Sequence, residues 1–128
     1  FAKDHNVNVN FLGKLNNDEI LERLKKYRYY ISSSTFEGNP KSVLEALSVG
    51  CVVFASSIKN HKELIKDGVN GFLFDLDDDS LREIFLKNYN KENLTKISKN
   101  AKKNIYETNS IEQFIETENT DYQNLLKR

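Results

Sequence analysis

Apolar residues gather along the chain in short runs, and their spacing predicts alternating strands and helices. Alternation of apolar and polar residues over 7–11 predicts a first strand, and residues 29–32 predict the next. The continuous apolar run 51–55 is typical of a parallel strand that is buried on both faces. A further strand is expected over 71–75. Segments with helical periodicity separate these runs, so strand and helix alternate.

End signals accompany each predicted helix between these strands. The first predicted helix covers residues 18–27, follows an Asn16 cap with Glu19 three residues on, and carries Ile20, Leu21 and Leu24 on one stripe. The second starts near Pro40, with Asn39 as its N-cap, and ends at Gly50. The third is a short helix over about 62–66, which Gly68 stops.

The chain becomes helical after the acidic turn 75–79. Its apolar stripes are Leu81, Ile84 and Phe85; then Leu94, Ile97, Ala101 and Ile105; then, after a capping-box pattern at Ser110 and Gln113, Phe114, Ile115, Tyr122, Leu125 and Leu126. We therefore expect a single domain over 1–128, with an α/β portion over 1–75 and a helical portion over 78–128.

Repeated strand, helix, strand units predict an α/β fold, in which a Rossmann-like parallel sheet with right-handed crossovers is flanked by helices. Ligands of such sheets bind beyond the carboxyl ends of the strands. The loops 13–17 and 33–40 emerge at that edge. Both loops are expected to meet at one pocket.

The helix that starts near Pro40 is a candidate anion site. Proline suits the first helical position, and the first backbone N–H groups of a helix have no partner within it. These donors are those of Lys41 and Ser42, together with Val43 if the helix starts one residue later. Because they lie at the positive end of the helix dipole, a diphosphate would bind well there.

Two carboxylates flank this candidate anion site. Glu45 shares a helix face with Lys41 and Ser42, where it could accept two hydrogen bonds from the vicinal diol of a ribose. Glu37 lies in the preceding loop, where Gly38 would let the chain turn tightly and expose the carboxylate. Taken alone, Glu45 would be a solvated helix residue paired with Lys41, and Glu37 an ordinary loop acid.

At these residues the chain resembles the C-terminal, donor-binding domain of retaining GT-B glycosyltransferases of the family 4 type. Glu37 and Glu45 match the two acids of that family's E-x7-E motif, within Ser-x-x-Glu-Gly-Asn-Pro-x-Ser-x-Leu-Glu-Ala-Leu-x-x-Gly. The pattern continues through residues 63–74, and the resemblance covers most of the chain. This longer pattern favours a function for both acids.

The resemblance implies transfer of a glycosyl group, of hexosyl type, from a nucleotide diphosphate sugar to an acceptor hydroxyl with retention of configuration, in polysaccharide or glycoconjugate synthesis. It implies no metal and no cofactor other than the donor substrate. The implied roles are a catalytic contact of Glu37 with the sugar, though not as a nucleophile; diphosphate binding by Lys41, Ser42 and Val43; ribose binding by Glu45; sugar and loop contacts of Gly38, Asn39 and Pro40; and base binding by the loop Gly13, Lys14 and Leu15.

Two departures from the resembled pattern concern the expected site. Lys59 and Asn60 stand where many relatives carry two glycines, and the neighbouring His61 could approach the sugar, although a lone loop histidine is ordinarily solvated. A Gly-Arg-Leu strand and a phosphate-binding Arg and Lys pair do not precede Val7. We therefore expect a partial donor domain without its N-terminal acceptor-binding domain, which would not turn over donor alone.

Composition excludes little. Lys plus Arg and Asp plus Glu both number 19, so no net positive charge favours nucleic acid or an anionic membrane surface. Cys51 is the single cysteine, so no internal disulfide can form, which fits a cytoplasmic protein. No apolar stretch approaches the length of a membrane span, so any association with the inner face of the membrane would be peripheral.

The alternative is a nucleotide-binding or interaction module without catalysis. A dinucleotide-binding dehydrogenase fits less well, because no Gly-x-Gly-x-x-Gly follows a strand.

Overall fold

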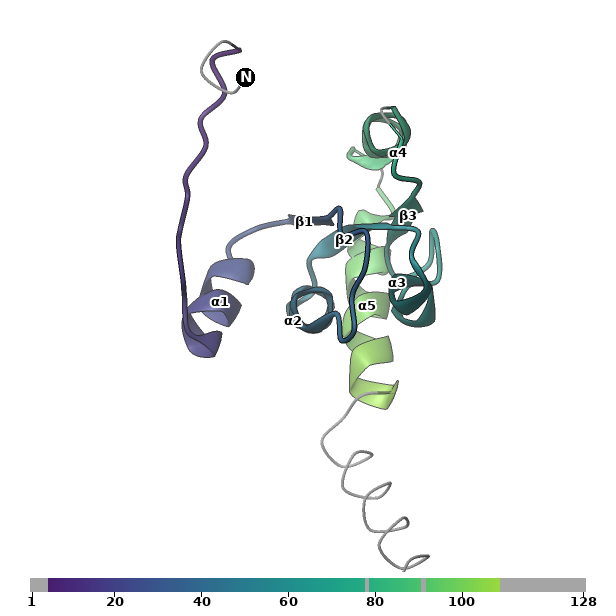
Figure 1. Cartoon of the computed structure of the whole chain (residues 1–128). Helices are drawn as coiled ribbons and strands as arrows, with labels where there is room; N and C mark the ends of the chain where they lie inside the picture. The colour runs from purple at the N-terminus through teal and green to yellow at the C-terminus, as the bar shows by residue number, and fades with distance from the viewer. Residues whose placement is uncertain (1–4, 78, 91, 109–128) are drawn as a thin grey trace, which may run out of the picture.

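A parallel sheet of three strands, flanked by helices, forms the centre of the computed structural model, which describes residues 5–77, 79–90 and 92–108 (Figure 1). The elements are α1 (Asn17–Leu24), β1 (Tyr29–Ser32), α2 (Lys41–Val49), β2 (Val52–Ser56), α3 (Lys59–Leu64), β3 (Phe72–Phe74), α4 (Ser80–Asn88) and α5 (Leu94–Thr108). This arrangement confirms the predicted α/β class with a parallel sheet.

The strand β2 lies between β1 and β3 and is buried along its whole length. Its side chains alternate between two cores. Val53 and Ala55 face the core that includes Val43 and Leu47 of α2, whereas Phe54 faces a second core on the other side of the sheet. Figure 1 shows α2 and α3 on one side of the sheet and α4 on the other, with α5 starting behind the sheet and running on beside α2. The sequence correctly predicted a strand that is buried on both faces.

The end signals of two helices are confirmed in detail. At the start of α1, the Asn16 side chain accepts from the Glu19 N–H and the Glu19 carboxylate accepts from the Asn16 N–H, both at 2.9 Å. At the end of α2, Gly50 takes the left-handed conformation with φ of 87°. The Cys51 N–H then bonds to the Ala46 carbonyl, which satisfies one of the last carbonyls of α2.

Three boundaries differ from the sequence predictions. Helix α1 ends at Leu24 and not at residue 27, because the next backbone hydrogen bonds span only three residues. They run from the Lys26 N–H to the Arg23 carbonyl and from the Tyr27 N–H to the Leu24 carbonyl. Helix α3 covers Lys59–Leu64, earlier than predicted, because Ile65 is extended and buried in the core. Gly68 therefore belongs to a later turn and does not end the helix.

The strand predicted over residues 7–11 is absent. This segment is an extended arm that runs away from the sheet (Figure 1), and Val7, Val9 and Phe11 are 54, 48 and 94% exposed. A strand needs a neighbour to pair its backbone groups, and the arm lies beside no other strand of the described residues. The prediction of a strand here is therefore wrong for the described residues. The apolar residues predicted from Ser110 onward lie outside the described part of the chain.

Cys51 immediately precedes β2 and is 1% exposed. Its sulfur lies 3.4 Å from the Leu24 carbonyl and 3.5 Å from the Tyr27 carbonyl. Burial raises the pKa of the Cys51 thiol, which therefore remains neutral at pH 7. The thiol joins the end of α1 to the sheet as a structural residue.

Candidate functional site

The start of α2 lies just beyond the carboxyl end of β1 and presents unpartnered backbone donors. Pro40 precedes the helix with φ of −79° and ψ of 59°, an inverse γ-turn geometry in which the Lys41 N–H bonds back to the Asn39 carbonyl at 2.8 Å. The first helical bond runs from the Leu44 N–H to the Pro40 carbonyl at 3.0 Å. The N–H groups of Ser42 and Val43 therefore have no acceptor among the described residues.

This geometry corrects two predictions. Asn39 is not the N-cap, because the tight turn at Pro40 places its backbone carbonyl, and not its side chain, beside the first helical N–H. The Lys41 N–H is consequently occupied and cannot donate to an anion. The helix starts one residue later than Pro40, so the Val43 N–H is free, as the later start predicted, and the free donors are those of Ser42 and Val43.

Glu45 lies one turn into α2, and its side chain is only 14% exposed. Its carboxylate is 3.7 Å from the ammonium group of Lys41, which is itself 61% exposed. The same ammonium group donates to the Asn17 side chain at 2.8 Å. Lys41 therefore joins the start of α1 to the start of α2, and Glu45 is more enclosed than a solvated helix residue would be.

The predicted base-binding loop leads directly into α1. Gly13 takes a left-handed conformation with φ of 66°, which favours glycine at this turn, and Lys14 is exposed while Leu15 is half-buried. Because Asn17 follows this loop and contacts Lys41, the loop lies beside the start of α2. One side-chain hydrogen bond thus links the end of the loop 13–17 to the residue that follows the loop 33–40, and a pocket shared by the two loops stays a prediction.

Glu37 is half-buried in the loop between β1 and α2, and its carboxylate accepts a hydrogen bond from the Ser34 hydroxyl at 2.6 Å. Phe36 beside it is 84% exposed. Gly38 is not in the left-handed region, and a Cβ there would meet no atom within 4 Å, so the predicted need for glycine at this turn is wrong. The turn is made at Pro40 instead.

Three residues of this region were missed or misread from the sequence. His61 is fully buried, so the expectation that it is solvated is wrong. Its imidazole contacts Ser56 at the carboxyl end of β2, and Ser56 in turn donates to the Ser34 carbonyl at 2.6 Å. The Asn60 side chain donates to the Gly38 carbonyl at 2.8 Å. The polar residues between the last position of β2, Ser56, and His61 were the only signal of these contacts.

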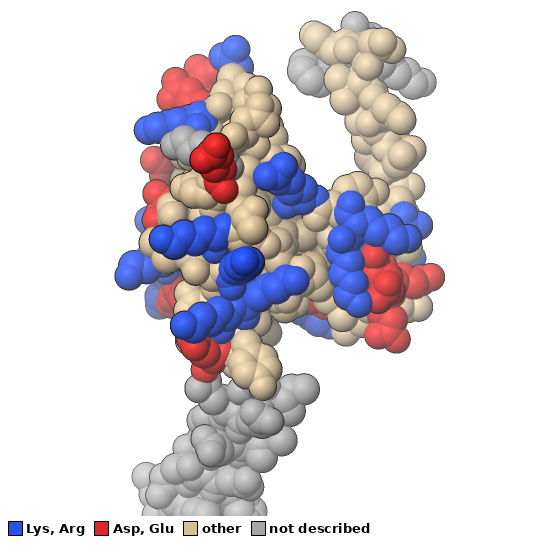
Figure 2. Space-filling view, turned by 180° about the vertical axis from the view of Figure 1, so that it is seen from behind, with Lys and Arg blue, Asp and Glu red and all other residues tan. Residues whose placement is uncertain are grey.

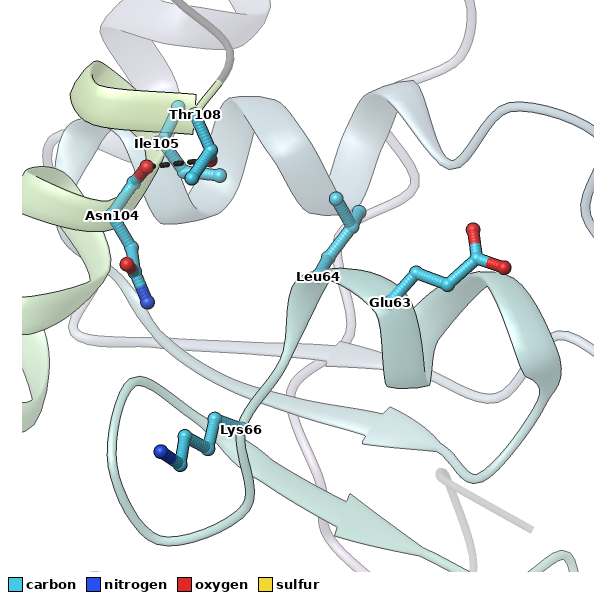
Figure 3. Close-up of a pocket in the computed structure, with 6 residues that line it drawn as sticks. All are labelled: Glu63, Leu64, Lys66, Asn104, Ile105 and Thr108. Atoms are coloured by element: carbon cyan, nitrogen blue, oxygen red, sulfur yellow. Dashed lines mark hydrogen bonds between the residues drawn. The ribbon is translucent and has the colours of Figure 1, made fainter.

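A hollow of about 400 Å³ lies away from this site, where α3 and α5 end and the chain approaches the start of β3 (Figure 3). Its lining residues are Glu63, Leu64, Lys66, Asn104, Ile105 and Thr108. Because ligands of parallel sheets bind at the carboxyl ends of the strands, this hollow is not the predicted pocket.

Charge is unevenly distributed although the chain is neutral overall. Helix α5 carries Lys96, Lys99, Lys102 and Lys103 against the single acid Glu107. Figure 2 shows Lys and Arg side chains gathered on the face opposite that of Figure 1. Within the described ranges, no three His, Cys, Asp or Glu side chains are placed to hold a metal ion. None of the helices described is long and apolar enough to cross a membrane.

Comparisons with known proteins agree with this architecture. Residues 2–107 match the model of the family "Glycosyl transferases group 1". The chain is 36% identical over 59 residues to the capsular polysaccharide biosynthesis glycosyltransferase CapH of Staphylococcus aureus, an alignment that covers 46% of this chain and 16% of CapH. The chain therefore spans only a small part of this relative.

Two solved structures share the fold. Anabaena HepE, solved in complex with UDP and glucose, superposes with a TM-score of 0.73 at 25% identity, over 88% of this chain and 32% of HepE. The C-terminal domain of the group 1 glycosyltransferase LpcC of Francisella tularensis superposes with a TM-score of 0.69 at 23% identity, over 86% of this chain and 59% of that domain. Both neighbours are GT-B glycosyltransferases. The chain thus belongs to the glycosyl transferases group 1 family and has the fold of a GT-B C-terminal domain.

Proposed function

We propose that this chain binds the nucleotide diphosphate sugar donor of a glycosyltransferase, with the diphosphate at the start of α2. The observation that carries the proposal is the pair of unpartnered N–H groups of Ser42 and Val43, one turn from the enclosed Glu45. Two aligned N–H groups at the positive end of a helix favour an anion, and a carboxylate beside them suits a neutral diol. HepE, which binds UDP and glucose, supports a donor of this class.

In this arrangement Glu45 accepts from the ribose hydroxyls, and the loop Gly13, Lys14 and Leu15 contacts the base. Lys41 adds positive charge beside the diphosphate. Glu37, with Gly38, Asn39 and Pro40, lies where the sugar extends beyond the phosphates. The family 4 type of transferase fits the spacing of the two glutamates, and with it a retaining mechanism.

Transfer would break the bond between the sugar and the diphosphate and form a bond from the same carbon to the oxygen of an acceptor hydroxyl, whose proton would pass to the leaving diphosphate. The Ser42 and Val43 N–H groups would stabilise the charge of the leaving diphosphate without a metal, and each such donor commonly contributes on the order of a hundredfold in rate. The acceptor would bind to a further domain outside this sequence. The proposed context is polysaccharide synthesis, which the likeness to CapH supports. The proposed compartment is the cytoplasm.

Replacing Ser42 with aspartate tests the phosphate site without weakening the helix. A carboxylate in the first turn favours helix α2 by about 0.3–1 kcal/mol, yet it would repel a diphosphate by about 1–4 kcal/mol at a few ångströms. We expect S42D to lose affinity for a nucleoside diphosphate by at least about fivefold. Calorimetric titration with UDP, GDP and ADP would measure this and identify the base.

The matched control is S42N, which changes the side chain without adding charge and should bind close to the wild type. Thermal unfolding of both variants would exclude a loss of fold. Equal diphosphate affinity in S42D and S42N would show that the phosphates do not bind at α2.

A further inference from the structure

Side chains of β2 and α3 form hydrogen bonds with the loop that carries Glu37. Three hydrogen bonds form a chain: His61 Nδ1 lies 2.8 Å from the Ser56 carbonyl, Ser56 Oγ lies 2.6 Å from the Ser34 carbonyl, and Ser34 Oγ lies 2.6 Å from the Glu37 carboxylate. His61 and Ser56 are both fully buried. The glutamate is therefore linked to the protein interior and not only to its own loop.

The acceptors fix the direction of every hydrogen in this chain. A carbonyl oxygen can only accept, so His61 Nδ1 carries a proton and donates to Ser56, and the Ser56 hydroxyl donates to Ser34. The Ser34 hydroxyl donates its hydrogen to the Glu37 carboxylate. Ser32 Oγ, 3.5 Å from Ser34 Oγ, can then only donate to it. Ser34 is thus held both at its backbone and at its side chain.

His61 Nε2 is buried and has no hydrogen-bond partner among the described residues. An unpaired buried polar atom opposes folding, so an apolar side chain would suit this position better if packing alone mattered. The feature that distinguishes histidine from an apolar residue here is the Nδ1 donor, which bonds to the Ser56 carbonyl. A ring that is 0% exposed cannot touch a donor sugar, so His61 acts through its neighbours.

Asn60 provides a second attachment to the same loop, one residue past Glu37. Its side-chain amide donates to the Gly38 carbonyl at 2.8 Å. Asn60 belongs to α3, as does His61, so this short helix bonds to the Gly38 side of the loop directly and reaches the Ser34 side only through Ser56 of β2.

We propose that His61 and Asn60 are positioning residues, which fix the Glu37 loop against β2 and α3 so that the carboxylate is held ready for the donor sugar. The contact of Glu37 with the sugar rests on the proposed function, whereas the fastening of the loop rests only on the hydrogen bonds above. The two can therefore be tested separately.

The test compares S56A, H61L and H61N in the full chain by 15N relaxation, without ligand. H61L removes the donor but keeps an apolar group, and H61N restores an N–H near the position of Nδ1. We expect the order parameters of the Glu37 and Gly38 amides to fall from the rigid range near about 0.85 toward about 0.6 in S56A and H61L, with recovery in H61N.

S98A is the matched control. Ser98 Oγ donates to the Gly50 carbonyl at 2.6 Å, the same bond at the same length as that of Ser56, but between α5 and the end of α2. The S98A variant should lose about as much free energy of unfolding as S56A, with no change in the order parameters of the Glu37 loop. Unchanged order parameters in both S56A and H61L, or an equal change in S98A, would overturn the positioning role.

The second measurement is the affinity for UDP and for UDP-glucose in the same variants. Loosening Glu37 should change the ratio of the two affinities by about fivefold, the value of one hydrogen bond, and leave UDP affinity itself unaltered. An unaltered ratio in a variant whose loop has loosened would overturn the link to the sugar. If the wild type binds neither nucleotide while H61L loosens the loop, the positioning role stands and the donor site fails.

Discussion

Replacing Phe54 with alanine is expected to lower the free energy of unfolding by about 3–5 kcal/mol, the usual cost of removing a fully buried aromatic ring. Phe54 is 0% exposed at the centre of β2. Its ring lies 4.9 Å from that of Phe72, 5.2 Å from that of Phe85 and 6.2 Å from that of Tyr29, between ring centroids. The substitution leaves a cavity that is bordered by all three strands and by α4.

Urea denaturation measures this change, and F36A is its control. Phe36 has the same side chain but is 84% exposed, so its removal should change the free energy of unfolding by less than about 0.5 kcal/mol. Similar losses in F54A and F36A would show that the core is not centred on β2.

Replacing Glu45 with alanine is expected to weaken nucleoside diphosphate binding by about tenfold or more. A ribose diol bound to a charged carboxylate contributes about 1.5–3 kcal/mol, the range for hydrogen bonds to charged groups. The fold should be little affected, because among the described residues the ion pair lost is that with Lys41, which is 61% exposed. Calorimetric titration with UDP measures the loss.

A ligand with one hydroxyl fewer makes this test specific. In the wild type, 2′-deoxy-UDP should bind more weakly than UDP, and in E45A this difference should largely vanish, as in a double-mutant cycle. E63A is the control, because Glu63 is an exposed helix glutamate beside the remote hollow. If E45A keeps the full preference for UDP over 2′-deoxy-UDP, Glu45 does not bind the ribose.

Elements with strong local signals were predictable from the sequence. The apolar run of β2, the capping box at Asn16 and the left-handed Gly50 each depend on neighbours in the chain, and each appears in the structure. The arm over residues 7–11 shows the limit of this reasoning. Its alternation is that of a strand, but pairing depends on a partner that local sequence does not specify.

The place of the candidate site follows from general rules, whereas its detail does not. The order of strands and helices predicts a pocket at the start of α2, and that place stays a prediction. The occupied Lys41 N–H follows from the γ-turn at Pro40, a backbone geometry that the residue type alone does not reveal. The buried His61 follows from the packing of α3 against β2, which brings together residues that no periodicity connects.

The central claim is that the nucleoside diphosphate binds at the start of α2 between the Gly13–Leu15 loop and Glu45. The most direct measurement is a map of backbone amide shifts of the full chain during titration with UDP. We expect the largest shifts at Ser42 and Val43, whose N–H groups are free, with further shifts over residues 12–17 and at Glu45. Shifts centred on the hollow beside Lys66 and Asn104, or no shifts at millimolar UDP, would contradict it.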